Sequence, residues 1–203
     1  MMPRPIPSTR RRWLAACAAA GALLLGGCSR QPAFENLDIT GNTQFGQDFA
    51  LPDTTGRTRT LADYKGRAVV LVFGYTHCPD VCPTTLAELA QARQQLGAEG
   101  KRVQVLLVTV DPERDTAPLI AQYVAAFDPS FVALRPAGEA QLKQVAKDFR
   151  IYYAKSPGKT PDGYTMDHTA ASYVFDPAGK LRLFVRDGQG PAPWVHDLRL
   201  LLG

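Results

Sequence analysis

Two uninterrupted apolar runs predict strands that are buried on both faces. They are AVVLVFGY (68–75) and VQVLLVTV (103–110), both rich in β-branched residues. Neither run shows the regular polar alternation of a half-exposed strand, and such runs are typical of a parallel sheet covered on both sides. A shorter run, FVALR (131–135), predicts a third strand.

Four segments between and after these strands repeat apolar residues at helical spacing, and each predicts a helix. They are Pro83–Leu96, 116–127, 138–149 and a last helix that carries Trp194, Val195, Leu198 and Leu201. In the first helix Pro83 suits the first turn, and Thr85 with Glu88 fits a capping box.

Turn-forming residues predict two hairpins, one near each end of this pattern. The N-terminal hairpin turns at residues 53–56, and the second turns at residues 176–179 between SYVFD and KLRLFV. A loop, AKSPGKTPDGYTMD (154–167), precedes the second hairpin. The order of elements predicts an α/β fold with a mixed central sheet flanked by helices and an N-terminal hairpin. Functional groups of such sheets collect at the carboxyl ends of the parallel strands.

The first 27 residues have the pattern of an export signal. Arg10, Arg11 and Arg12 precede an apolar stretch over residues 13–27, too short to span a bilayer comfortably. The stretch ends in Leu25-Gly26-Gly27-Cys28, which resembles a bacterial lipobox, although an ordinary signal peptide with a chance cysteine is an alternative. We therefore expect a lipoprotein signal peptide over 1–27.

The lipobox also predicts how the mature chain is organised and where it works. We expect a lipidated Cys28 with a tether over 28–45, and one folded domain over 46–203. The lipid would anchor the chain to the periplasmic face of a membrane in the bacterial cell envelope.

Loss of the signal changes the charge of the chain. The full sequence carries 23 basic and 19 acidic residues, and four of the arginines lie within residues 1–27, which hold no acid. The mature chain is therefore balanced in charge. Its net charge gives no reason to expect binding to nucleic acid or to an anionic membrane surface.

Only two thiols remain after maturation, because Cys17 leaves with the signal and Cys28 would carry lipid. The remaining pair, Cys78 and Cys82, is four positions apart, and outside the cytoplasm such a pair indicates a disulfide or a metal site. A zinc ribbon would need a second cysteine pair. The alternative interpretation is a surface disulfide that has no function.

The surroundings of the two cysteines favour reactive thiolates. Each cysteine precedes a proline, which predicts an extended Cys78 and places Cys82 where the helix starts. Both sulfurs would face the positive end of that helix, which lowers thiol pKa. The three intervening residues leave room for an ion, and two thiolates with one imidazole suit copper in either oxidation state.

Three motifs in this order resemble the Sco (SenC) family of copper proteins. They are FGYTHCPDVCPTTLAEL (73–89), VTVDPERDT (108–116) and DHTAASYVFDPAGKL (167–181), and the resemblance covers roughly residues 34–200. It implies a thioredoxin-like fold and a copper site formed by Cys78, Cys82 and His168. It also implies that the chain supplies copper to the copper-A subunit of cytochrome c oxidase, with another periplasmic copper chaperone or thiol reductase as a further partner.

His168 has support beyond the resemblance. A lone histidine is more often a surface or capping residue than a ligand. Thioredoxin-like oxidoreductases, however, place a cis-proline against their dithiol, and this chain has no proline between Pro161 and Pro177. That position falls within HTAAS (168–172), so the sequence predicts imidazole chemistry there instead.

Other polar residues near the cysteines have competing interpretations. His77 is predicted to point away from Cys78, Asp80 to be a loop carboxylate rather than a ligand, and His196 to face solvent. For Asp111 a role at the site and a role as a turn former before Pro112 are equally favoured.

These observations leave three functions open. The leading one is a copper carrier without enzymatic activity. The rival is a thiol–disulfide oxidoreductase in which Cys78 and Cys82 form the redox pair that keeps oxidase cysteines reduced. A copper or redox sensor is a third possibility. Peroxidase activity is disfavoured, because Tyr75 and Leu71 stand where a peroxiredoxin has threonine and proline.

Overall fold

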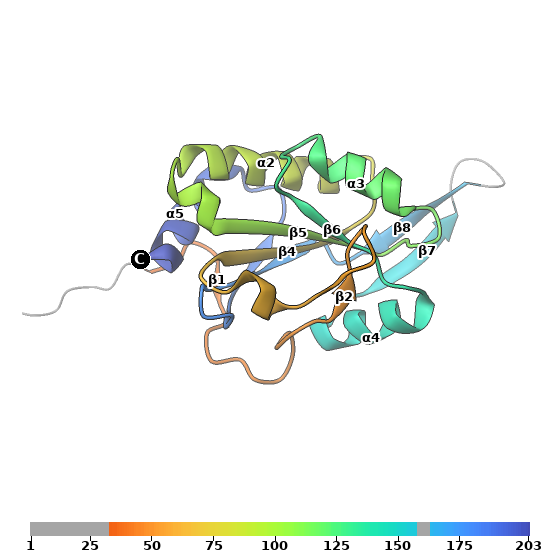
Figure 1. Ribbon diagram of the computed structural model, residues 1–203, viewed down its shortest axis with the longest axis horizontal. Helices are drawn as coiled ribbons and strands as arrows, with labels where there is room; N and C mark the ends of the chain where they lie inside the picture. The colour runs from red at the N-terminus through yellow and green to blue at the C-terminus, as the bar shows by residue number, and fades with distance from the viewer. Residues whose placement is uncertain (1–32, 158–162) are drawn as a thin grey trace, which may run out of the picture. The chain divides into compact units, whose positions relative to one another are not determined.

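The computed structural model describes residues 33–157 and 163–203, which contain a six-stranded mixed sheet (Figure 1). The predicted signal peptide and Cys28 lie outside these residues. In the order β1-β10-β9-β4-β5-β6 the sheet comprises β1 (Leu37–Asp38), β10 (Leu181–Arg186), β9 (Ala171–Phe175), β4 (Ala68–Gly74), β5 (Val103–Thr109) and β6 (Val132–Leu134). Strands β4, β5 and β6 are parallel, and β9 is antiparallel to β4. All residues of β4 and β5 are buried, as the two apolar runs predict.

Helices cover both faces of the sheet, because alternate residues of β4 point to opposite sides. Val70 and Val72 pack in a core with α2 (Val81–Gln95), α3 (Ala117–Ala125) and α5 (Pro191–Leu202). Leu71 and Phe73 pack in a second core with α4 (Glu139–Phe149), which lies on the opposite side of the sheet from α2 in Figure 1. Two short 3₁₀ helices, η1 (Leu61–Tyr64) and η2 (Glu99–Arg102), precede β4 and β5.

The predicted N-terminal hairpin is confirmed. Strands β2 (Leu51–Pro52) and β3 (Thr58–Arg59) pair antiparallel on either side of the expected turn. Upstream of the hairpin, β1 pairs with β10, so the folded unit extends to Phe34, within the segment expected to act as a tether. Among the described residues, no helix has the length and apolar character needed to cross a membrane.

The predicted capping box of the first helix is wrong, because α2 begins at Val81, upstream of both residues. Asp80 is the N-cap residue, and Thr85 lies fully buried within the helix. Glu88 accepts a hydrogen bond from the backbone N–H of Gly190 instead. Pro83 does lie in the first turn, where its missing N–H leaves no helical bond unmade.

The predicted loop over 154–167 is also wrong. Strands β7 (Tyr153–Pro157) and β8 (Tyr164–His168) form a two-stranded antiparallel ribbon separate from the central sheet. Met166 is the only buried residue of these two strands, so the ribbon lacks the apolar pattern by which a strand is recognised. His168 is therefore the last residue of a strand and not the end of a loop.

Candidate metal centre

The fold brings the two cysteines and His168 together at the carboxyl end of β4. Cys78 lies in the turn after that strand, Cys82 is the second residue of α2, and His168 ends β8. One sulfur or nitrogen atom from each residue lies within 4.8 Å of the other two. The described residues contain no other such group of three histidine, cysteine or acidic side chains.

The distances suit a single metal ion. Cys82 Sγ lies 3.7 Å from His168 Nε2. Metal bonds of about 2.3 Å to sulfur and about 2.0 Å to nitrogen separate two ligands of one ion by roughly 3.5–4.5 Å. The donor set of two sulfurs and one imidazole nitrogen therefore fits a soft metal ion with little rearrangement.

Local backbone features place the two sulfurs. The Cys78 N–H donates to the Tyr75 carbonyl, 3.3 Å away, and closes the turn after β4. The Cys82 N–H, at the start of α2, donates to Cys78 Sγ over 3.4 Å. Gly74 makes room for the buried thiol, because a Cβ atom there would lie 2.7 Å from Cys82 Sγ.

The two thiols differ in protonation. Cys82 is 2% exposed, whereas Cys78 is partly exposed. A hydrogen bond from the Cys82 thiol lowers the pKa of Cys78 to about 3, in spite of burial, and His168 and backbone N–H groups act in the same direction. That hydrogen bond, burial and the Cys78 charge raise the pKa of Cys82. The pair at neutral pH is one thiolate and one thiol, and a metal must displace the Cys82 proton.

His168 presents Nε2 to the sulfurs. Its Nδ1 lies 3.1 Å from the Thr169 carbonyl oxygen, which favours a proton on Nδ1 and leaves Nε2 as the atom that binds a metal once it has lost its own proton. Burial lowers the pKa of His168, but hydrogen bonding to the Cys78 thiolate and to Thr169 raises it more. The edge-to-face ring of Tyr75, 5.9 Å between centroids, fixes the other side of the imidazole.

A cluster of three residues ties the ribbon to the end of β5, and we call it the ribbon clamp: Asp111, Arg114 and Tyr164. Tyr164 donates its hydroxyl to Asp111 over 2.9 Å, and Arg114 Nε donates to the same carboxylate over 2.5 Å. The Arg114 guanidinium lies 3.5 Å from the centroid of the Tyr164 ring and donates to the Tyr164 carbonyl. Asp111, for which two roles were open, thus supports the strand that carries His168.

Tyr75 gives β8 a second support. Its hydroxyl is buried and accepts a hydrogen bond from the Met166 N–H over 3.2 Å, two residues before His168. Sequence reasoning did not single out Tyr75 for this position, because its partner is a backbone group of a strand that the pattern did not predict.

The remaining polar residues lie at the margins of the site. His77 is exposed, and its Nδ1 contacts Thr76 Oγ1 at 3.0 Å, away from the sulfurs as predicted. Asp80 lines a hollow of about 340 Å³ beside Cys78 and His168 without reaching ligand distance. His196 is half-exposed on α5 and contacts Asp197.

A half-buried carboxylate near the site was also missed. Asp187 follows β10, accepts a hydrogen bond from Ser172 over 3.3 Å and borders a small hollow with Asp80 and Val81. Burial raises the pKa of Asp187 to about 6. The sequence RDGQG around it is that of an exposed turn, so only the neighbouring residues of α2 reveal its partial burial.

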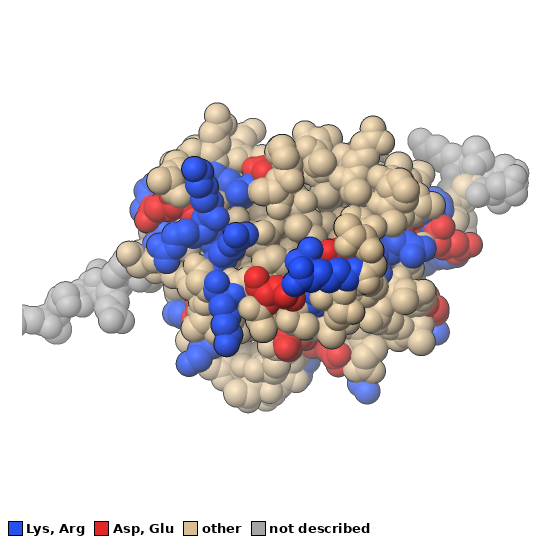
Figure 2. Space-filling model, viewed as in Figure 1, with Lys and Arg blue, Asp and Glu red and all other residues tan. Residues whose placement is uncertain are grey.

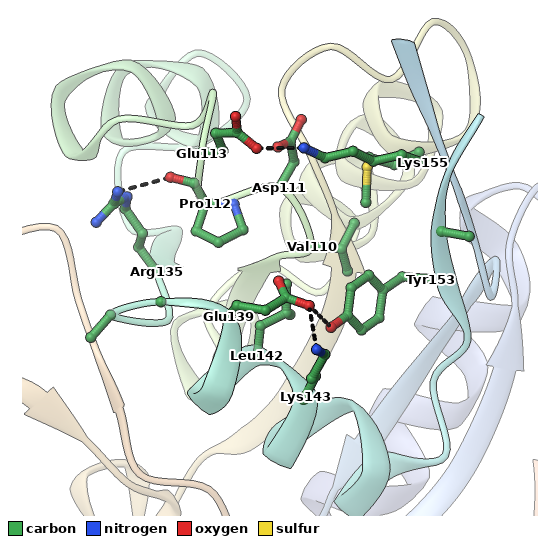
Figure 3. Close-up of a pocket in the computed structure, with 14 residues that line it drawn as sticks. Val110, Asp111, Pro112, Glu113, Arg135, Glu139, Leu142, Lys143, Tyr153 and Lys155 are labelled. Carbon is green, nitrogen blue, oxygen red and sulfur yellow. Dashed lines mark hydrogen bonds and ion pairs between the residues drawn. The ribbon is translucent and has the colours of Figure 1, made fainter. Parts of the chain in front are cut away.

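A larger cavity, of about 750 Å³, lies between the ribbon and the first turns of α4 (Figure 3). Met166 lines both this cavity and the hollow at the metal centre. Glu113 pairs with Lys155, and Glu139 with Lys143, at its rim. Its lining includes neither a cysteine nor a histidine, so the cavity lacks the ligand chemistry of the cysteine site.

Comparison with known proteins agrees with this geometry. A family model described as SCO1/SenC matches residues 38–203. The Bos taurus protein named SCO2 homolog, mitochondrial, is 45% identical over 134 residues, which are 65% of this chain and 50% of the relative. The chain spans about half the length of the curated relatives it matches.

Solved structures extend the similarity to the fold. Bradyrhizobium japonicum ScoI, solved with copper bound, is 37% identical with a TM-score of 0.66, covering 77% of this chain and 99% of that one. Apo Sco1 from Thermus thermophilus is 35% identical with a TM-score of 0.73, covering 85% of this chain and 99% of that one. The fold is thioredoxin-like, as expected.

Proposed function

The chain belongs to the SCO1/SenC family, and we propose that it carries one copper ion on Cys78, Cys82 and His168 and supplies it to the copper-A centre of cytochrome c oxidase during assembly. The observation that carries this proposal is the convergence of the three side chains within 4.8 Å. Copper is also the metal bound in the similar Bradyrhizobium japonicum structure.

The donor set suggests how each oxidation state is held. Two thiolates satisfy Cu(I), whereas Cu(II) gains from a third, imidazole ligand. The sulfurs come from one short segment, whereas His168 comes from the ribbon. Loss of the imidazole is therefore expected to weaken Cu(II) binding far more than Cu(I) binding.

Transfer to a partner requires an accessible ligand. Cys78 and His168 border the open hollow, whereas Cys82 is buried beneath them. An acceptor thiolate or imidazole could enter at the hollow and replace Cys78 or His168 first, and Cys82 last. Cys82 would recover its proton when the metal leaves.

A second function, thiol–disulfide oxidoreductase, is favoured by the unequal thiols. The Cys78 thiolate would attack a partner disulfide, and Cys82, after losing its proton, would attack the resulting mixed disulfide. The partner would leave as a dithiol and this chain would hold a Cys78–Cys82 disulfide. A thiol reductase would have to restore it. Copper and disulfide exchange exclude each other at any instant, because both use this pair.

We propose that this work takes place at the periplasmic face of a bacterial membrane. The support is the basic and apolar signal pattern over residues 1–27 and the lipobox at Cys28. In this proposal Cys28 carries the lipid, and the partners are the copper-A subunit of the oxidase and a periplasmic copper donor or thiol reductase.

The experiment is a copper titration of the purified mature chain with His168→Ala, and with His77→Ala as the matched control. We expect one copper per chain, a large loss of Cu(II) affinity in His168→Ala, and little change in the control because His77 lies outside the site. Equal Cu(II) affinity in all three proteins would refute the proposed ligand set.

A complementation experiment in cells distinguishes copper delivery from thiol–disulfide exchange. Oxidase copper content is measured in cells lacking the protein, after complementation with His168→Ala or with Cys82→Ser. Failure of both variants supports copper delivery. Rescue by His168→Ala alone would favour the reductase, because disulfide exchange needs the thiols and not the imidazole.

A further inference from the structure

The end of the central sheet opposite the metal centre carries exposed basic side chains. We call this group the basic end: Lys65, Arg67, Lys101, Arg102 and Lys180. Within the described parts of the chain, none of the five pairs with an acidic side chain. Figure 2 shows Lys and Arg side chains gathered at the left of the view, the end at which Figure 1 marks the C-terminus.

Strand register explains why these residues gather. Ala68 of β4 is paired with Val103 of β5, so Arg67 and Arg102 immediately precede neighbouring strand starts. The Gly66 N–H donates to the Pro177 carbonyl over 2.9 Å, which joins this edge to the β9–β10 turn that carries Lys180.

Acidic residues close in sequence to the basic end are paired with other basic side chains, as Asp63 is with Arg57. Glu99 pairs with Arg199 at 3.7 Å, and Asp176 with Arg182 at 3.1 Å. The positive charge of the five side chains is therefore uncompensated locally, although the mature chain as a whole is balanced. A balanced net charge is compatible with an uneven distribution of charge over the surface.

The N-terminal segment reaches the fold next to this end. The Arg182 guanidinium, bound to Asp176 of the β9–β10 turn, lies 5.6 Å from the centroid of the Phe34 ring. The Glu35 N–H is held by Asp197 of α5 over 2.8 Å. Cys28 precedes Phe34 by six residues, which span at most about 20 Å. A lipid on Cys28 would keep this part of the domain close to the bilayer.

We propose that the basic end docks on anionic phospholipid headgroups of the membrane in which Cys28 is anchored. This docking turns the metal centre away from the bilayer. The proposal rests on the proposed lipid anchor. Each Lys or Arg near an anionic surface favours binding by roughly fivefold. A short tether raises the local concentration to the millimolar range, so such weak contacts suffice.

The orientation has a functional consequence. The metal centre lies at the opposite ends of β4 and β5, each of seven residues. At about 3.3 Å per residue these strands hold the centre roughly 20 Å farther from the membrane than the basic end. The site would then face a partner domain that stands above the same membrane.

The experiment uses the lipidated mature chain in phosphatidylcholine vesicles with or without phosphatidylglycerol, each with a trace of dansyl lipid. Trp194 is the only tryptophan after residue 27, so energy transfer from it reports the approach of the domain to the bilayer. We expect more transfer with phosphatidylglycerol, and loss of the difference at high salt because screening shortens the reach of the charges.

Two charge-matched variants locate the contact. Lys101→Glu with Arg102→Glu changes η2, and Lys143→Glu with Lys147→Glu makes the same change on α4. The η2 variant is expected to lower the ratio of docked to free domain by roughly 25-fold or more, and the α4 variant to behave as the wild type. Unchanged copper uptake by both variants shows that their folds are intact.

Two results would overturn the docking. One is equal transfer in neutral and anionic vesicles, and the other is equal loss in the η2 and α4 variants. A chain that fails to float with either kind of vesicle would refute the lipid anchor, and the docking with it. None of these results bears on the proposed copper function, because copper uptake is measured separately in solution.

Discussion

His168 Nε2 lies 3.7 Å from Cys82 Sγ, although the two residues are 86 positions apart in the chain. Cys82 is fixed by α2 and the central sheet, whereas His168 is fixed by a ribbon outside that sheet. The fold therefore holds the ligands near their bound positions before any metal arrives. Such preorganisation lowers the entropic cost of binding.

The low pKa of Cys78 predicts unusual alkylation kinetics. Below about pH 8.5 the thiolate fraction of an ordinary cysteine, and with it the alkylation rate, rises about tenfold per pH unit. With a pKa of about 3, Cys78 is already ionised, so its rate with iodoacetamide should be nearly constant above about pH 5. The alkylation rate is measured by labelling the reduced, metal-free chain for a series of fixed times and counting the label by mass spectrometry.

Cys82→Ser provides the control for this prediction. It replaces the thiol that hydrogen-bonds to the Cys78 thiolate with a hydroxyl of different reach, so the plateau should shift to higher pH. A wild-type rate that climbs about tenfold per unit between pH 5 and 8 would show that Cys78 has an ordinary pKa.

Gly74 is predicted to be intolerant of any side chain. In Gly74→Ala the new Cβ would stand 2.7 Å from Cys82 Sγ, and relieving that contact should cost roughly 1–3 kcal/mol of stability. Cu(II) affinity should fall as well, because the sulfur must move. Urea unfolding and copper titration measure the two effects. Gly138→Ala meets nothing within 4 Å and should bind copper normally.

The sequence predicts the scaffold of this site better than its details. Strands β4 and β5 are predictable because strands buried on both faces consist of uninterrupted apolar residues. The ribbon was missed because the Tyr75 hydroxyl and the ribbon clamp hold it, and such long-range contacts leave no periodic pattern. His168 was found through its motif, before the structure showed which strand carries it.

Charge distribution was the other property that composition could not predict. Arg67 and Arg102 are far apart in the chain, and only the parallel register of β4 and β5 makes them neighbours. Asp187 was missed for a similar reason, since its partial burial depends on the packing of α2 against the segment after β10.

The raised pKa of Asp187 predicts that the free energy of unfolding decreases as pH rises. Its folded pKa of about 6 exceeds the ordinary aspartate value of 3.8, so the folded state binds the proton more tightly than the unfolded state. Below about pH 4 both states are protonated and there is no penalty. Above about pH 6 the partly desolvated charge costs roughly 1–3 kcal/mol.

Asp187→Asn should therefore stabilise the chain at pH 7.5 and have little effect near pH 4, as urea unfolding at both pH values would show. Asp80→Asn, at a more exposed carboxylate, is the control and should shift stability little at either pH. A destabilised Asp187→Asn at pH 7.5 would mean that the ionised carboxylate is held by hydrogen bonds stronger than its burial cost.

The ribbon clamp predicts a copper defect without a loss of ligands. Tyr164→Phe keeps the ring under Arg114 but removes the hydroxyl that donates to Asp111 over 2.9 Å. One such hydrogen bond contributes about 1 kcal/mol, so the ribbon should leave its bound position about fivefold more often. Cu(II) affinity should fall by a similar factor, and Cu(I) affinity should not, because only Cu(II) needs His168.

Arg114→Ala removes the stacking and two further hydrogen bonds, so its Cu(II) defect should be larger. The matched control is Tyr152→Phe, which removes a hydroxyl from a ring that is 64% exposed and should bind both ions normally. The sulfur-to-Cu(II) charge-transfer band separates positioning from general destabilisation. A mobile imidazole should shift that band, whereas a merely less stable protein should keep its position and lose intensity. An unchanged band and unchanged Cu(II) affinity in Arg114→Ala would show that Tyr75 alone positions His168.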